Sequence, residues 1–128
     1  EVLRGAAKPE RGFLLHSYGG PAEMVEGFAK MGAYFSVSPY FAHERKRQQL
    51  EVFKSVPLER LLIETDAPAM WPPRELNPHP LVHPDGSEAN SPVNLGFCYE
   101  LAAKLRGLPV AELAQIVGEN YRRLFGPA

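Results

Sequence analysis

The sequence has little cysteine and no excess of charge of either sign. Cys98 is the single cysteine among 128 residues, which excludes an internal disulfide and fits a reducing compartment such as the cytoplasm. The 14 basic and 15 acidic residues leave a formal charge of −1. Tight binding to duplex nucleic acid through charge alone is therefore disfavoured, and no acidic tail indicates a basic partner.

Long apolar runs and the common catalytic motifs are also missing from the sequence. No apolar run approaches the length of a membrane span, and the first residues do not have the pattern of a signal peptide. The nucleophile elbow G-x-S-x-G, the P-loop and zinc-finger spacings do not occur. The first residue is Glu1, so we expect a chain that is processed, trimmed or part of something longer. Its length predicts one domain, 1–128.

What the sequence does contain is an alternation of strand and helix patterns. Short apolar segments predict strands over 12–16, 33–38 and 60–66. Helical spacing predicts helices between and after them, over 21–31, 43–55, 91–106 and 109–117, with a last short helical piece over 120–125. Strands that alternate with helices are typical of a parallel sheet, so we predict an α/β fold with about three parallel strands and flanking helices.

One segment, 67–90, departs from this alternation. Seven prolines lie between Ala67 and Pro92, and no periodic apolar face accompanies them: Pro68, Pro72, Pro73, Pro78, Pro80, Pro84 and Pro92. We expect a long loop without secondary structure, and loops of this length are usually functional or disordered. His79 and His83 have ligand-like spacing, but the prolines around them prevent a helix, so we interpret both as loop residues.

The third predicted strand ends with two carboxylates. Glu64 and Asp66 are two residues apart, so a strand directs both to one face, together with Leu62. The carboxyl ends of parallel strands are where α/β folds place ligands and catalytic groups. The alternative is structural, with Asp66 capping a turn and Glu64 in a salt bridge.

His16 and Asp66 follow the first and third predicted strands, and therefore reach the same edge of a parallel sheet. An imidazole and a carboxylate are ligands for zinc, manganese and similar ions, although a histidine at a strand end is often only a satisfied turn residue. Beside His16, Tyr18 either stacks on a base or sugar or lies in the core. The basic run 45–47 either contacts phosphates or forms a solvated helix face.

Five segments in the same order resemble the C-terminal part of the TatD family of metal-dependent deoxyribonucleases, in the amidohydrolase superfamily. The resemblance extends from about residue 12 to 126. The segments are His16-Ser17-Tyr18-Gly19-Gly20, Gly32-Ala33-Tyr34-Phe35-Ser36, Arg60-Leu61-Leu62-Ile63-Glu64-Thr65-Asp66-Ala67-Pro68, Asn90-x-Pro92, and Asn120-x-x-Arg123-Leu124-Phe125-Gly126.

This resemblance implies a TIM-like barrel whose sixth, seventh and eighth strands are the three predicted here. It also implies a divalent metal ion (magnesium, manganese or zinc) at the carboxyl ends of the strands. His16 and Asp66 match the family's metal ligands, and Asp66 also matches its proton acceptor. Many family members have His-Cys-Phe-Ser-Gly where this chain has His-Ser-Tyr-Gly-Gly, but neither the cysteine nor the phenylalanine is a ligand.

The chain lacks several features of the family. A His-x-His pair, a mid-chain glutamate and a further histidine precede the sixth strand in the family, and no residue before His16 supplies them. A barrel closes with eight strands, and this chain offers three. We therefore expect about half of an enzyme, whose open sheet edges are covered by the missing N-terminal half or by self-association.

The function implied is cleavage of phosphodiester bonds in DNA by a metal-bound water, once the protein is complete. Asp66 would take the proton, and Glu64 would be a supporting carboxylate behind the metal ligands. Tyr18, Arg74 and Asn90 are candidate substrate contacts, with Trp71 also in the wall of the cleft. Two alternatives are an amidohydrolase-type enzyme that cleaves C–N bonds and a catalytically silent fragment that acts as an assembly or binding module.

Overall fold

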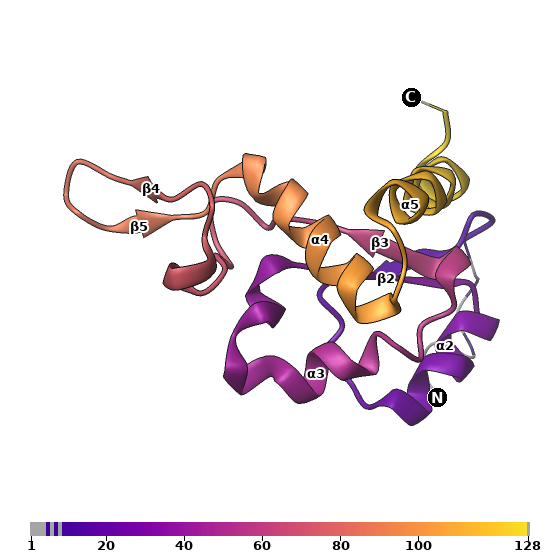
Figure 1. Cartoon of the computed structure of the whole chain (residues 1–128). Helices are drawn as coiled ribbons and strands as arrows, with labels where there is room; N and C mark the ends of the chain where they lie inside the picture. The colour runs from indigo at the N-terminus through magenta and orange to yellow at the C-terminus, as the bar shows by residue number, and fades with distance from the viewer. Residues whose placement is uncertain (1–4, 6, 8, 128) are drawn as a thin grey trace.

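The computed structural model describes residues 5, 7 and 9–127. Three strands form a parallel sheet in the order β1 (Phe13–Leu15), β2 (Ala33–Val37) and β3 (Leu61–Ile63), as Figure 1 shows. The register pairs Phe13 with Ala33 and Phe35 with Leu61. The predicted α/β fold with three parallel strands is therefore confirmed, although the third strand is shorter than the predicted 60–66.

The two faces of β2 have different surroundings. Phe35 and Val37 are buried on one face, where the ring of Tyr18 meets Phe35 edge-on with 5.2 Å between the ring centroids. Tyr34 and Ser36 are also buried, and alternation directs them to the opposite face. The first face forms the hydrophobic core, while the second leads to polar groups at the carboxyl edge of the sheet.

Short helical segments connect the strands. Between β1 and β2 the chain forms a 3₁₀ turn and then α2 (Val25–Lys30). Between β2 and β3 it forms two 3₁₀ turns (Pro39–Ala42 and Glu44–Lys46) and then α3 (Arg47–Val52). The prediction of one helix over 43–55 was wrong, because Lys46 has φ −104° and ψ 1° and interrupts the helix. A further 3₁₀ turn, Leu58–Arg60, leads into β3.

Two longer helices, α4 (Leu95–Arg106) and α5 (Val110–Phe125), follow the sheet. The side chain of Ser91 caps the 3₁₀ turn Pro92–Asn94 that leads into α4. Gly107, with φ 65°, ends α4 in the left-handed conformation that glycine favours. None of the helices in the described part of the chain is long and apolar enough to span a membrane.

The prediction of two helical pieces over 109–117 and 120–125 was wrong, because α5 is continuous. The helix continues through Gly118 without interruption, and Asn120 lies on its buried face. The Nδ2 atom of Asn120 donates to the carbonyl oxygens of Leu58 (2.7 Å) and Leu61 (2.8 Å). A buried polar side chain that holds the start of β3 thus interrupts the apolar pattern but not the helix.

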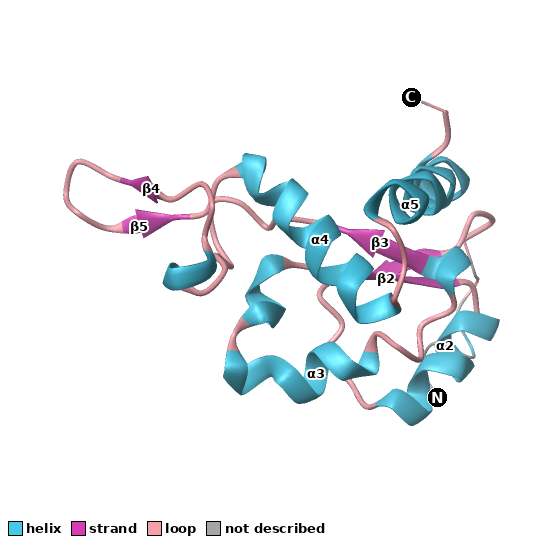
Figure 2. Cartoon of the chain, viewed as in Figure 1, coloured by secondary structure: helices cyan, strands magenta, loops and turns pink. Residues whose placement is uncertain are grey.

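The proline-rich segment contains secondary structure that the sequence analysis did not predict. A 3₁₀ turn, Arg74–Leu76, is followed by an antiparallel hairpin of β4 (Leu81–Val82) and β5 (Glu88–Ala89). Asp85 and Gly86 lie in its turn, and Gly86 has φ 84°, a left-handed conformation that glycine adopts readily. Figure 2 shows this hairpin extending away from the helices and the three-stranded sheet.

Candidate metal centre

Three ionisable side chains converge where β1 and β3 end. The Nδ1 atom of His16 lies 2.8 Å from Oε2 of Glu64, and its Nε2 atom lies 3.4 Å from Oδ1 of Asp66. One ligand atom from each residue lies within 4.8 Å of the others. The His16 side chain is 60% exposed, whereas those of Glu64 and Asp66 are 17% and 14% exposed. The cluster is therefore open to solvent on its histidine side.

Local backbone geometry brings these side chains together. His16 directly follows β1, and the amide of Glu64 still donates to the carbonyl oxygen of Val37 (3.1 Å), which extends the sheet pairing by one residue. Asp66 lies beyond the strand with φ 57°. Simple strand alternation therefore does not place Asp66 beside Glu64; a left-handed turn returns its carboxylate to the cluster.

Ser17 lies at the centre of the cluster, and the sequence analysis did not identify it. Its hydroxyl lies 2.8 Å from Oε1 of Glu64 and 3.0 Å from Oδ2 of Asp66. Its amide faces the hydroxyl oxygen of Ser36 (3.2 Å) and Oε1 of Glu64 (3.1 Å). The signal in the sequence was its place next to His16, directly after the first predicted strand.

The contact with Glu64 determines which nitrogen of His16 is free. With a proton on Nδ1, the ring donates to Glu64 and leaves the Nε2 lone pair directed toward Asp66. A carboxylate that holds a histidine in this way is the usual support for a metal-binding imidazole. The pKa of His16 is raised above its usual value. The hydrogen bond to Glu64 is the main cause; burial lowers the pKa, and the charges of Glu64 and Asp66 raise it further.

The donor set fits a divalent cation. Two carboxylates surround one histidine, and the single hydroxyl proton of Ser17 lies within reach of both, so the cluster carries excess negative charge when both acids are ionised. Metal–ligand distances of about 2.0 to 2.2 Å allow two donors up to about 4 Å apart to bind one ion. The 3.4 Å between Nε2 of His16 and Oδ1 of Asp66 is within this limit.

Asn90, a predicted substrate contact, lies behind the cluster rather than in front of it. The residue is 1% exposed, and its Nδ2 atom donates to the carbonyl oxygens of Thr65 (2.6 Å) and Ala69 (2.9 Å). The backbone amide of Asn90 donates to the carbonyl oxygen of Pro68 (2.8 Å). Asn90 thus holds the backbone on both sides of Asp66, and its buried position disagrees with direct contact with substrate.

The other two predicted substrate contacts also lie outside the cluster. Tyr18 is 8% exposed, packs against Phe28 and Phe35, and donates its hydroxyl to the carbonyl oxygen of Pro21. Its ring is therefore a core side chain and does not present a face for stacking. Arg74 is exposed and forms an ion pair with Glu88 at the base of the hairpin (2.6 Å).

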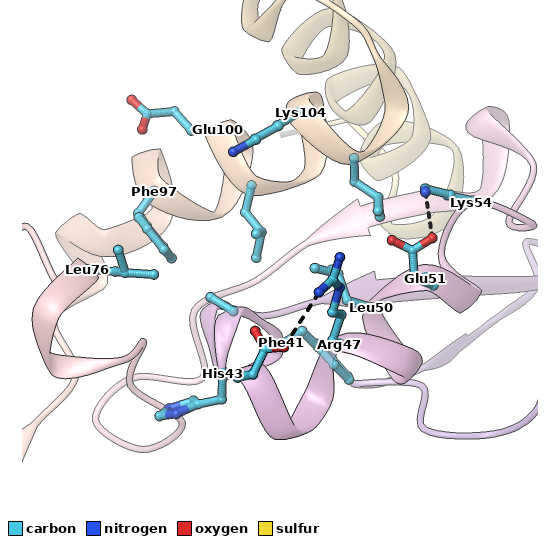
Figure 3. Close-up of a pocket in the computed structure, with 14 residues that line it drawn as sticks. Phe41, His43, Arg47, Leu50, Glu51, Lys54, Leu76, Phe97, Glu100 and Lys104 are labelled. Atoms are coloured by element: carbon cyan, nitrogen blue, oxygen red, sulfur yellow. Dashed lines mark ion pairs between the residues drawn. The ribbon is translucent and has the colours of Figure 1, made fainter.

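Two cavities differ in their relation to the cluster. A cavity of about 460 Å³ is lined by Glu64 together with Leu14, Leu62 and residues of α4 and α5. Another, of about 550 Å³, lies between α3 and α4, with an apolar floor and a charged rim (Figure 3). None of the three cluster residues lines the second cavity. The first cavity therefore meets the cluster at Glu64, and the second is separate from it.

A parallel sheet with an imidazole and two carboxylates at its carboxyl edge is the arrangement that metal-dependent hydrolases of the α/β barrel class use. The chain belongs to the TatD related DNase family, whose model matches residues 1–126. It is 32% identical over 124 residues to the uncharacterized metal-dependent hydrolase YabD of Bacillus subtilis, covering 97% of this chain and 45% of YabD. It is 35% identical over 118 residues to the 3'-5' ssDNA/RNA exonuclease TatD of Escherichia coli, covering 91% of this chain and 43% of that protein.

Solved structures that resemble this one include two proteins of the TatD type. YjjV, a TatD homologue from Escherichia coli, matches with a TM-score of 0.76 and 25% identity, over 92% of this chain and 42% of YjjV. A TatD family hydrolase from Entamoeba histolytica matches with a TM-score of 0.72 and 18% identity, over 91% and 43%. The chain thus spans less than half the length of the relatives it matches.

Proposed function

We propose that this chain forms the carboxyl-edge metal centre of a hydrolase that cleaves phosphodiester bonds in DNA when the barrel is complete. The observation that carries the proposal is the convergence of His16, Glu64 and Asp66 at one sheet edge. A relative at 35% identity is named as a 3'-5' exonuclease of single-stranded DNA and RNA, which supports a nucleic-acid substrate. The proposed location is the cytoplasm, because the single cysteine is buried and unpaired.

Each side chain of the cluster has its own proposed task. Nε2 of His16 and the carboxylate of Asp66 bind the cation, and Glu64 fixes the His16 ring through Nδ1. When bound, the divalent ion lowers the pKa of water and offsets negative charge on the phosphate. Asp66 accepts the proton that the attacking water loses. Ser17 holds the two carboxylates in place through its hydroxyl.

The metal proposed is magnesium, manganese or zinc. A histidine ligand favours zinc or manganese over magnesium, because imidazole binds the softer ions more tightly. Carboxylate ligands accept all three. A titration of the chain with manganese and zinc by calorimetry, beside its Asp66→Ala variant, tests the ligand set: binding by the unaltered chain and no binding by the variant are expected.

Replacement of Asp66 by asparagine tests the catalytic assignment. We expect Asp66→Asn to abolish metal-dependent hydrolysis of a single-stranded oligonucleotide by the complete protein, because an amide neither takes the proton nor carries the ligand charge. The melting temperature should change by only a few degrees, since the change keeps the shape of the side chain. Asp85→Asn, an exposed carboxylate in the hairpin turn, is the matched control. Full hydrolysis by Asp66→Asn would refute the assignment.

The alternative substrate class is a C–N bond, because the same kind of centre supports both reactions. Parallel assays with oligonucleotides and with amides and lactones separate the two.

A third proposal concerns assembly. The sheet ends at β1 on one side and β3 on the other, so it has two edges within the described residues. Three strands do not close a barrel. We propose that the missing part of the barrel, or a second copy of the chain, covers these edges. Light scattering after size-exclusion chromatography distinguishes a monomer from a self-associated form.

A further inference from the structure

Two loops leave the sheet at the edge that carries the proposed metal-binding cluster of His16, Glu64 and Asp66, and they contact each other. One follows β2 and contains Tyr40 and His43; the other follows Asp66 and contains Trp71. The Nε2 atom of His43 lies 3.1 Å from the carbonyl oxygen of Trp71, so a ring N–H donates across the gap. The Tyr40 and His43 rings lie 5.1 Å apart. The two loops therefore form one surface next to the cluster.

This surface carries two cations, Arg45 and Lys46, that form no ion pair with a carboxylate of the described residues. The Nη2 atom of Arg45 donates to the Tyr40 hydroxyl (2.7 Å). The Arg45 guanidinium carbon and the Lys46 Nζ lie 5.2 and 5.5 Å from the centre of the Tyr40 ring. Among the described residues, no carboxylate lies within ion-pair distance of either, whereas the neighbouring Arg47 pairs with Glu44 at 3.6 Å. Arg45 and Lys46 therefore lie side by side at the Tyr40 ring, and their charges are available to bind an anion.

The second loop carries an exposed aromatic side chain, and a hollow lies between the two loops. Trp71 is 40% exposed, although the next two residues, Pro72 and Pro73, are buried and hold its backbone. A cavity of about 360 Å³ lies between the two loops, and His43, Arg45 and Pro73 line it. Glu44 and Glu75 also line this cavity, and their charge disfavours phosphates on their side. Anionic groups are thus directed toward Arg45 and Lys46.

We infer that these two loops bind a single-stranded nucleic acid on its way to the metal cluster. Arg45 and Lys46 contact two phosphates, and the Trp71 indole stacks on an unpaired base. Cations beside exposed aromatic rings are the usual means of holding single strands, and stacking requires a base free of its partner. The inference rests on the proposed function, because it names the form of its substrate and the residues that guide it.

The test is a binding measurement without divalent metal, which separates it from hydrolysis. The probe is a labelled oligothymidylate of about twelve nucleotides, measured by fluorescence anisotropy in EDTA with the full chain; an oligouridylate separates DNA from RNA. Trp71→Ala should weaken binding about tenfold, and Trp71→Phe should retain most of it. Arg45→Gln with Lys46→Gln should weaken binding about tenfold at low salt and reduce the salt slope by about 1.4.

Matched controls exclude a general effect of lost charge or lost aromatic surface. Lys30→Gln with Lys54→Gln removes two cations that are paired with Glu26 and Glu51, and Tyr121→Ala removes an aromatic ring that is 49% exposed on α5. Both controls should bind like the unaltered chain.

The outcomes separate the two proposals. Loss of binding in Trp71→Ala and in the Arg45 and Lys46 variant, with the controls intact, supports the inference. It is overturned if the unaltered chain does not bind the oligonucleotide, if both loop variants bind as well as it does, or if the controls weaken binding equally. A different outcome is binding that depends on the loops together with no metal-dependent hydrolysis by the complete protein. This outcome would refute the proposed function but leave the loop surface as a binding site.

Discussion

The loop that follows Asp66 has two parts that are held in opposite ways. Its base, on either side of Pro68, is fixed by four hydrogen bonds from Asn90, which is 1% exposed. Its arm, the β4–β5 hairpin, has two residue pairs, and Leu81 and Val82 in it are 48% and 64% exposed. Figure 1 shows the arm standing away from the sheet. The same proline-rich segment thus contains a buried base and an exposed arm.

The comparison shows that prolines alone do not fix the position of Asp66 in the cluster. The arm contains Pro84 and flanking prolines, yet little of it is buried. The base is held because one amide side chain satisfies backbone carbonyl groups that a turn leaves without partners. Asn90 is in turn supported by Asn94, whose Nδ2 atom donates to its Oδ1 atom (2.8 Å). The position of Asp66 therefore depends on a residue 24 positions later in the chain.

The largest effect should follow from Asn90→Ala. The change leaves the carbonyl oxygens of Thr65 and Ala69 buried without their donor, so we expect the free energy of unfolding to fall by about 2 to 4 kcal/mol. Metal affinity should fall as well, because the turn that carries Asp66 is released. Urea denaturation and metal titration measure the two effects. His79→Ala, at an exposed position near the arm, is the control and should leave both unchanged. A stability equal to that of the control would show that the base is not held in this way.

Sequence reasoning located the strands because their signals are local. The three apolar segments and the glycine and proline residues that end the elements are read within a few residues of each other. The carboxyl ends of parallel strands lie at one edge of a sheet, and this rule places the ends of the first and third strands together. The convergence of His16 and Asp66 at this edge is what that rule predicts, and their role as metal ligands stays a prediction.

Long-range hydrogen bonds were beyond such reasoning. Asn90 bonds to a carbonyl 25 residues away and Asn120 to carbonyls 62 and 59 residues away, and nothing near either asparagine in the sequence indicates these partners. Asn120 and Arg123, which donates to the Asn120 Oδ1 atom, appeared only as letters of a family motif. The structure gives that motif a physical meaning, since it fastens α5 to the start of β3.

Removal of the arm should have a smaller effect than the change at Asn90. Leu81 pairs with Ala89, so a short Gly-Ser link in place of 81–88 joins chain ends that already lie side by side. We expect the free energy of unfolding to change by about 1 kcal/mol or less, because the lost contacts are exposed and the shorter loop costs less entropy to close. Thermal unfolding measures this, and the affinity for manganese should be unaltered. A loss as large as that of Asn90→Ala would mean that the arm supports the base.

The smallest effect should come from the ion pair between Arg74 and Glu88, which links the arm to the chain before it. Nη2 of Arg74 lies 2.6 Å from Oε1 of Glu88, but the Arg74 side chain is 84% exposed and that of Glu88 33%. Exposed ion pairs contribute about 0.2 to 1 kcal/mol, because water screens the charges and two long side chains lose freedom. A double-mutant cycle of Arg74→Ala and Glu88→Ala, measured by urea denaturation at low and high salt, isolates this energy. We expect a coupling within that range that declines as salt is added. A coupling that is larger and insensitive to salt would show that the pair is shielded from water, and the arm would then have to lie closer to the body than its exposed residues indicate.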